Sequence, residues 1–162
     1  MKKYTLTISL ILRLFLGTIM IIAGSGKFLK TSPTPIEVVE KASNENVKSN
    51  TSTLQKVLYI NGLKQTGFFW ETVAICELLF GIFLILYRTY FIGALFLLPI
   101  TLQIFLFHLF LEADEVGELL YCGLLLGINV FLIFIEKDRW KSLFNQFGPI
   151  KNLSLIHISE PT

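Results

Sequence analysis

The sequence predicts an all-α integral membrane protein, a four-helix bundle with a partly helical extracytoplasmic loop between the first and second helices. Two observations support this fold class. The 162 residues are 53% hydrophobic and only 16% charged, whereas soluble domains carry about 25% charged residues. The apolar residues also fall in four long runs, each close to the ~20 residues that span the hydrocarbon of a bilayer. We therefore expect one membrane domain over residues 1–152.

The four runs predict helices at about residues 6–28, 68–87, 90–111 and 119–135. The first run follows two lysines, as the core of a signal peptide does. It is longer than such a core, and Arg13 interrupts it. We interpret it as a transmembrane helix.

The loop between the first two runs, about residues 30–65, is the only sizeable part outside the membrane. Thr34-Pro35-Ile36-Glu37 matches a capping box with proline at the first helical position, which predicts a short helix over 35–41. A second helix is expected over 53–60, ended by Asn61-Gly62. Both helices are expected to lie on the outer membrane surface or to cap the bundle.

The distribution of lysine and arginine predicts that both termini are cytoplasmic. The acidic connection between the third and fourth runs has none of these residues, whereas the first loop has five lysines, which weakens the prediction without reversing it. The basic residues on the expected cytoplasmic side are Lys2, Lys3, Arg88, Lys137, Arg139, Lys141 and Lys151.

The last ten residues, 153–162, are expected not to belong to the native protein. Their sequence, LSLIHISEPT, resembles the translation of a transposase adapter used in preparing sequencing libraries. We interpret the segment as read-through after about Asn152 and exclude it, with its His157, from functional reasoning. The native C-terminus beyond that point is unknown.

Two charges lie inside apolar runs, Arg13 in the first and Glu77 in the second. An isolated charge near the bilayer centre costs about 2.5–3.5 kcal/mol on insertion scales, so such a group usually has a partner or a function. If both runs are centred in the membrane, the two side chains are within reach of each other. The sequence therefore predicts a buried Arg13–Glu77 pair, either structural or part of a ligand site.

Further polar residues are expected near the outer ends of the helices. Lys27 and His108 are candidates to close a polar pocket beneath the first loop, and Gln103 lies one turn after Pro99. Each also has a purely structural interpretation, as an interfacial anchor or an interhelical hydrogen bond. Asn129 is expected to make an interhelical hydrogen bond.

Small residues predict close helix packing. Gly17, Gly24 and Gly81 are the candidate contact positions, since glycine lets two helix backbones approach. Cys76 and Cys122 have no metal-binding spacing and are interpreted as packing residues, with a redox pair as the alternative. No metal site and no catalytic residue is predicted.

The order of these motifs resembles the DoxX family of small bacterial four-helix membrane proteins. The resemblance covers residues 10–144 and rests on six segments: RLFLG at 13–17, GSGKF at 24–28, TGF at 66–68, ELLFGIFL at 77–84, PITLQIFLFHLFL at 99–111 and RWKSLF at 139–144. Family members often carry asparagine where this chain has Gln103. The resemblance implies a multi-pass protein of the bacterial cytoplasmic (inner) membrane.

The resemblance also implies a functional class, because some relatives are similar to subunits of thiosulfate:quinone oxidoreductase or of other membrane oxidoreductase complexes. Three hypotheses follow. The chain is a quinone- or lipophile-binding component of such a complex, with a soluble or membrane oxidoreductase as partner. Alternatively it is a non-enzymatic membrane scaffold with a structural Arg–Glu pair, or a small transporter. Membrane lipid and a second copy of the chain are further candidate partners; the small net charge of +2 argues against nucleic acid.

Overall fold

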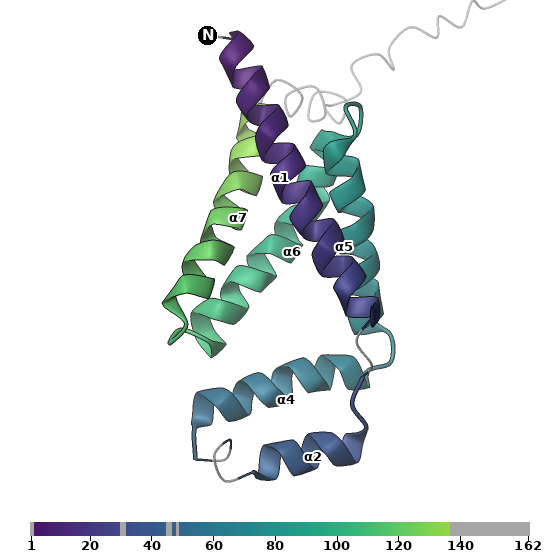
Figure 1. Cartoon of the computed structure of the whole chain (residues 1–162), viewed down its shortest axis with the longest axis vertical. Coiled ribbons are helices and arrows are strands. Elements are labelled where there is room, and N and C mark those ends of the chain that lie inside the picture. The colour runs from purple at the N-terminus through teal and green to yellow at the C-terminus, as the bar shows by residue number, and fades with distance from the viewer. Residues whose placement is uncertain (1, 30–31, 45–46, 48, 137–162) are drawn as a thin grey trace, which may run out of the picture.

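The computed structural model describes residues 2–29, 32–44, 47 and 49–136. The expected basic tail, residues 137–152, and the expected read-through, residues 153–162, lie outside the described residues. The described helices, labelled as in Figure 1, are α1 (Lys2–Leu29), α2 (Pro35–Ser43), α4 (Thr51–Gln65), α5 (Phe69–Ile85), α6 (Tyr90–Leu111) and α7 (Val116–Ile135).

Four long helices, α1, α5, α6 and α7, run alongside one another. Helix α1 packs most extensively on α5, α6 packs on both α5 and α7, and α7 makes a smaller contact with α1. The two loop helices, α2 and α4, contact each other and lie crosswise at one end of the long helices (Figure 1). The N-terminus and the α5–α6 turn lie at the opposite end.

The helices are apolar enough for a membrane protein, as the sequence predicted. Three of them, the segments Tyr4–Leu29, Tyr90–Leu111 and Val116–Ile135, each have the length and composition to cross a bilayer alone. Helix α5 has 17 residues and meets α4 at an angle of 86° across a short break. The described residues therefore contain three candidate spans, or four if α4 and α5 together form one broken span.

The capping box in the first loop is confirmed. The Glu37 amide donates to Thr34 Oγ1 at 3.4 Å, and the Thr34 amide donates to Glu37 Oε2 at 2.7 Å. Helix α2 begins at Pro35 as predicted and runs two residues beyond the predicted end.

The predicted end of the second loop helix at Asn61-Gly62 is wrong, because α4 continues to Gln65. Asn61 is buried inside the helix, and its Nδ2 donates to Val57 O, one turn earlier, at 2.6 Å. Glycine in a helix interior costs about 1 kcal/mol relative to alanine, which the packing of α4 against α5 and α6 can offset. The chain turns instead at Gly67, whose φ of 73° suits a residue without a Cβ.

Glycines lie where the long helices approach most closely. A Cβ added to Gly17 would lie 2.9 Å from Gly81 O, and one added to Gly24 would lie 2.8 Å from Ala74 O. Gly81 in turn faces Gly17 O at 3.1 Å. These contacts set the register of α1 against α5. Gly93, which the sequence analysis did not single out, is tighter still, since its added Cβ would lie 2.6 Å from Leu84 N.

Asn129 makes the interhelical contact that the sequence predicted. It is fully buried on α7, and its amide lies 3.1 Å from Thr101 Oγ1 on α6. With the amide turned to satisfy both of its polar atoms, its nitrogen donates to Ala94 O at 3.0 Å. This polar contact crosses the core that Leu16, Leu97 and neighbouring apolar side chains form.

Candidate functional site: a cavity between the long helices and α4

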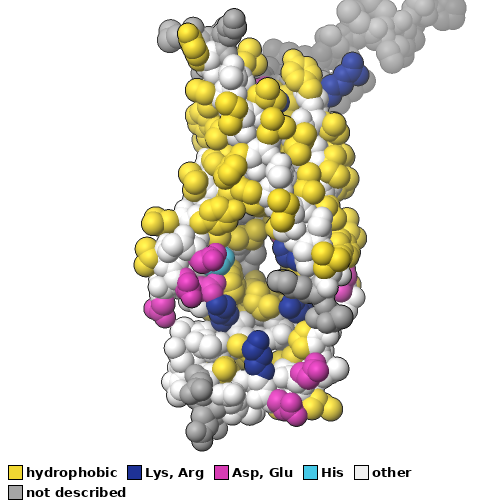
Figure 2. Space-filling view, in the orientation of Figure 1, with side chains coloured by type: hydrophobic (Ala, Val, Ile, Leu, Met, Phe, Trp, Pro, Cys, Tyr) yellow, Lys and Arg dark blue, Asp and Glu magenta, His cyan; other side chains and the backbone are white. Residues whose placement is uncertain are grey.

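A cavity of about 730 Å³ lies between the four long helices and α4, and its walls are mostly apolar. Figure 2 shows the surface hollowed between the apolar belt and the loop helices, with charged side chains around the opening. On α5 the lining positions are 69, 70, 73 and 77, and on α6 they are 99, 100, 103, 104, 107 and 108. Each set is one face of a helix. The volume lies within the range of about 300–1,000 Å³ that is typical of small-molecule sites.

A buried ion pair forms part of this wall. Lys27 Nζ of α1 donates to Glu77 Oε2 of α5 at 2.5 Å. The Glu77 side chain is 0% exposed and the Lys27 side chain 18% exposed. A short charge-assisted hydrogen bond of this kind holds both side chains in one orientation.

The predicted Arg13–Glu77 pair is therefore wrong, and the helix register explains why. The contacts of Gly17 with Gly81 and of Gly24 with Ala74 place Glu77 level with Ile21. That level is eight residues, or ~12 Å, from Arg13 along α1. The prediction assumed that α1 and α5 are both centred in the membrane, which places α5 about one turn away from its position in the structure.

Side-chain direction completes the explanation. Side chains on a helix lean toward its N-terminus, and α1 and α5 are antiparallel. Lys27 and Glu77 therefore lean toward each other, and their ion pair closes the ~9 Å that separates them along the axis. Arg13 leans away from Glu77 toward the start of α1.

Trp70, on the same wall, lies close to two lysines. Lys27 Nζ is 5.5 Å and Lys64 Nζ 4.9 Å from the centre of its ring. Both distances are within the range of cation–π attraction. Because Lys64 belongs to α4, this contact also joins the loop helix to the cavity.

A second polar group lies on the α6 side of the cavity. Gln103 Nε2 donates to the Tyr59 hydroxyl of α4 at 2.6 Å, and the Tyr59 ring packs on Phe107 with 5.7 Å between ring centres. His108 Nδ1 lies 2.9 Å from Glu112 Oε2, although the two atoms are not aligned as a hydrogen bond. Glu112 also pairs with Lys56 of α4.

Three of the lining side chains keep a buried polar atom without a hydrogen-bond partner among the described residues. These atoms are Trp70 Nε1, Glu77 Oε1 and His108 Nδ1. Buried polar groups in proteins are normally hydrogen-bonded, so a group of unpartnered atoms at one cavity calls for an explanation. A bound molecule with polar atoms would supply the missing partners.

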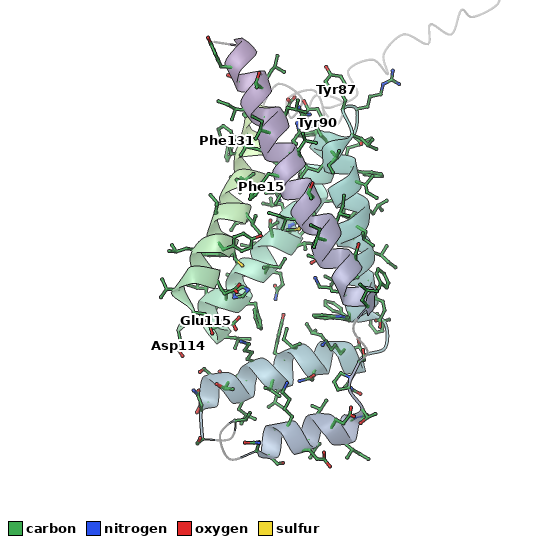
Figure 3. The ribbon with its side chains drawn as sticks, in the orientation of Figure 1. Phe15, Tyr87, Tyr90, Asp114, Glu115 and Phe131 are labelled. Atoms are coloured by element: carbon green, nitrogen blue, oxygen red, sulfur yellow. The ribbon has the colours of Figure 1, made fainter. Side chains whose placement is uncertain are left out.

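Arg13 is separate from this cavity. It is 4% exposed, its guanidinium lies 4.0 Å from the centre of the Tyr90 ring, and its Nε donates to Ser9 O at 3.2 Å. The Tyr90 hydroxyl donates to Glu136 Oε1. Figure 3 shows Tyr90 at the end of the long helices away from α4, whereas Asp114 and Glu115 lie at the α4 end.

The structure thus brings together four of the five predicted site residues. Lys27, Glu77, Gln103 and His108 line one cavity, and Arg13 does not. Ligand binding by these four residues stays a prediction. Sequence reasoning missed Trp70, although its spacing of seven from Glu77 places both on one face of α5.

The remaining chemical groups are limited. Cys76 and Cys122 are free thiols, and Cys122 lines the cavity. Within the part of the chain that the structure describes, no group of three or more His, Cys, Asp or Glu side chains is placed to hold a metal ion. The polar atoms of Trp70, Glu77 and His108 can bind and orient a molecule by hydrogen bonds.

Long apolar helices around a mostly apolar cavity define a multi-pass membrane protein with a candidate site for a lipophilic molecule. The family model described as DoxX matches residues 8–109, more than half of the chain. The chain therefore belongs to the DoxX family, as its motifs indicated. No curated protein and no solved structure matches it.

Proposed function

We propose that the cavity binds a lipophilic molecule with a polar head, with a quinone as the leading candidate. In this proposal the chain is a quinone- or lipophile-binding component of a membrane oxidoreductase complex. The observation that carries the proposal is the combination of apolar walls with three buried polar atoms that make no hydrogen bond among the described residues. Ligand sites typically combine a mostly apolar surface with a few polar groups that orient the ligand.

The placement of the polar groups supports a ring-like head. They lie on two walls, with Trp70 and Glu77 on α5 and His108 on α6. A quinone carries oxygen atoms on opposite sides of its ring, so a ring between α5 and α6 would meet polar atoms from both helices. Ionisable residues inside transmembrane segments often mark such pathways or sites.

We further propose that the chain lies in the bacterial cytoplasmic membrane with both termini in the cytoplasm. The α5–α6 turn, which contains Arg88, lies at the same end as the N-terminus (Figure 1). The acidic segment with Asp114 and Glu115 lies at the other end with the loop helices (Figure 3). The connection between α6 and α7 at that end contains no lysine or arginine, which agrees with the positive-inside rule, whereas the lysines of α2 and α4 at the same end do not. Labelling of single cysteines introduced at Arg88 and Asp114 from outside intact cells tests the orientation.

The direct test of ligand binding is to purify the full chain in mild detergent, extract it with organic solvent and quantify quinone by chromatography. Val73→Phe adds bulk to the cavity wall between Trp70 and Glu77. The matched control is Ile75→Phe, on the same helix, 53% exposed and not part of the wall. We expect quinone in the parent and in Ile75→Phe, and its loss in Val73→Phe.

A well-folded parent that carries no quinone and takes up none when it is added would overturn this proposal. The scaffold hypothesis would then be favoured, with Lys27–Glu77 in the structural role that was predicted for Arg13–Glu77. Substrate-selective flux through reconstituted vesicles would instead favour the small transporter.

A further inference from the structure

The two oxygens of Glu77 differ in their surroundings. Oε2 accepts a hydrogen bond from Lys27 at 2.5 Å, whereas Oε1 has no partner within the described residues. The side chain is 0% exposed and belongs to the cavity wall. An unsatisfied buried acceptor costs about 1–3 kcal/mol, and more when it is charged. A bound molecule that donates a hydrogen bond to Glu77 Oε1 would therefore remove the most costly of these unsatisfied groups.

The chemistry of the pair fixes what kind of group can meet this demand. An ammonium group can only donate hydrogen bonds, so the short contact with Lys27 identifies Glu77 as the acceptor. When this ion pair keeps Glu77 as a carboxylate, its second oxygen, Oε1, can only accept. An occupant that presents a carbonyl or ether oxygen at this point would place two acceptors together, whereas a hydroxyl group would supply the missing proton.

We infer that the cavity selects an amphiphile whose head carries a hydroxyl donor, and that Glu77 Oε1 accepts its hydrogen bond. For a quinone couple this ligand is the reduced, dihydroxy form, the quinol. The inference rests on the proposed function and deepens it, because it names the form of the ligand that the same site prefers.

Trp70 is consistent with this assignment. Trp70 lies on the same face of α5 as Glu77. Its Nε1–H group is a donor that has no hydrogen-bond partner in the described part of the chain. A hydroxyl oxygen can accept one hydrogen bond while its proton is donated elsewhere. A dihydroxy head therefore meets both a spare donor and a spare acceptor, which a head with carbonyl groups alone does not.

Glu77→Gln gives a specific test. Lys27 can only donate, so it holds the amide oxygen of the glutamine toward itself. The amide NH₂ then replaces Oε1, and the spare acceptor becomes a spare donor. The substitution preserves the side-chain shape, and it should reverse the preference of the site from hydroxyl heads to carbonyl or ether heads.

The probes are an alkyl-substituted hydroquinone kept reduced under anaerobic conditions, its dimethyl ether, and the matching quinone. The chain has two tryptophans, and Trp140 lies outside the described residues. In a Trp140→Phe background, the emission of Trp70 reports occupancy of the cavity directly. We expect the hydroquinone to bind about tenfold more tightly than its dimethyl ether, equivalent to about 1.4 kcal/mol.

In Glu77→Gln the quinone and the dimethyl ether should bind at least as tightly as the hydroquinone. Glu71→Gln makes the same chemical change on the same helix outside the cavity wall, and it should keep the parental order of affinities. Equal binding of hydroquinone and dimethyl ether in the parent, or an unchanged order in Glu77→Gln, would overturn the inference and leave the site lipophilic. Failure of all three probes to bind would overturn the proposed function as well.

Discussion

Arg13 and Lys27 are both cations on α1, one near each end of the long helices, and both lie close to an aromatic ring. Arg13 packs over Tyr90 and donates to Ser9 O, and it is not part of the cavity wall. Lys27 lies near Trp70 and pairs with Glu77, and all three side chains line the cavity. Similar side chains therefore make a packed polar contact at one end and part of a cavity at the other.

A buried charge in a membrane helix therefore does not by itself identify a site. Arg13 and Lys27 are both largely buried charges, and burying a charge in a membrane is costly at either position. Space and unsatisfied polar atoms distinguish the α4 end, where Glu77 Oε1 and Trp70 Nε1 have no partner among the described residues. We expect changes at Lys27 to alter both stability and binding, and changes at Arg13 to alter stability alone.

The largest effect is expected for Lys27→Met, which leaves the Glu77 carboxylate buried without its cation. Removing one member of a buried pair typically destabilises by about 3–5 kcal/mol. The double variant Lys27→Met/Glu77→Leu should recover most of this loss. Heat and denaturant unfolding in mild detergent, followed by circular dichroism, measures both.

The control for this prediction is Arg13→Met/Glu77→Leu, which removes the pair that the structure does not contain. It should show no such recovery relative to Glu77→Leu. If it recovers as well as the Lys27 double variant, the ion pair seen in the structure is not the one that stabilises the protein.

Gly24→Ala should have the next largest effect, a loss of about 1–3 kcal/mol from overpacking. The added Cβ would lie 2.8 Å from Ala74 O and 3.1 Å from Leu78 N, and backbone atoms cannot turn away as a flexible side chain can. Because Lys27 is one turn further along α1, binding of the hydroquinone probe should weaken as well.

Gly17→Ala provides the comparison at the Arg13 end. Its added Cβ would lie 2.9 Å from Gly81 O, so stability should fall by a similar amount while affinity for the probe is retained. Gly127→Ala lies inside α7 with nothing within 4 Å of the added Cβ, so it should leave affinity unchanged and raise stability by up to about 1 kcal/mol. Equal loss of affinity at positions 17 and 24 would contradict the separation of the two ends.

Arg13→Met should reduce stability by about 2 kcal/mol, the size of a desolvated cation–π contact, and leave probe affinity unchanged. Arg13→Lys keeps the charge without the planar guanidinium that stacks on Tyr90, and it should restore part of the loss. Unfolding and Trp70 emission titrations on the same samples measure the two properties. Weakened binding in Arg13→Met would show that the ends are coupled.

The smallest effect is expected for Lys56→Met, which breaks the pair between α4 and Glu112. The Lys56 side chain is 40% exposed, and exposed pairs contribute only about 0–1 kcal/mol. Global stability should hardly change, but amide hydrogen exchange in α4 should become faster. Unchanged exchange would show that Tyr59–Gln103 and the other contacts of α4 hold it without this pair.

Much of the fold could be predicted because apolar runs and capping motifs act locally. Helix α6 has the predicted bounds, Tyr90–Leu111, and α2 begins at the predicted capping box. Asn61-Gly62 misled the prediction of α4, because local helix propensity does not include packing against α5 and α6. The 86° bend between α4 and α5 is equally invisible in a linear apolar pattern.

The sequence predicted most residues of the candidate site, but it did not predict which of them form the ion pair. Lys27, Glu77, Gln103 and His108 stand out as polar residues in or beside apolar runs, and the structure places them around one cavity. Trp70 did not stand out, since a tryptophan at a helix start is ordinary at a membrane interface. The partner of Glu77 was assigned wrongly because hydropathy locates a helix in the bilayer only to within about a turn.

Composition and local spacing were enough to predict the all-helical membrane class, the family and the charged residues whose burial in the membrane is costly. The tertiary structure decided which of those residues meet. Backbone contact at Gly17, Gly24 and Gly81 sets the register of α1 against α5. In this register Glu77 pairs with Lys27. The register also leaves one Glu77 oxygen at the cavity wall without a hydrogen-bond partner among the described residues, because a hydrogen bond depends on ångström-scale positions that only the packed helices define.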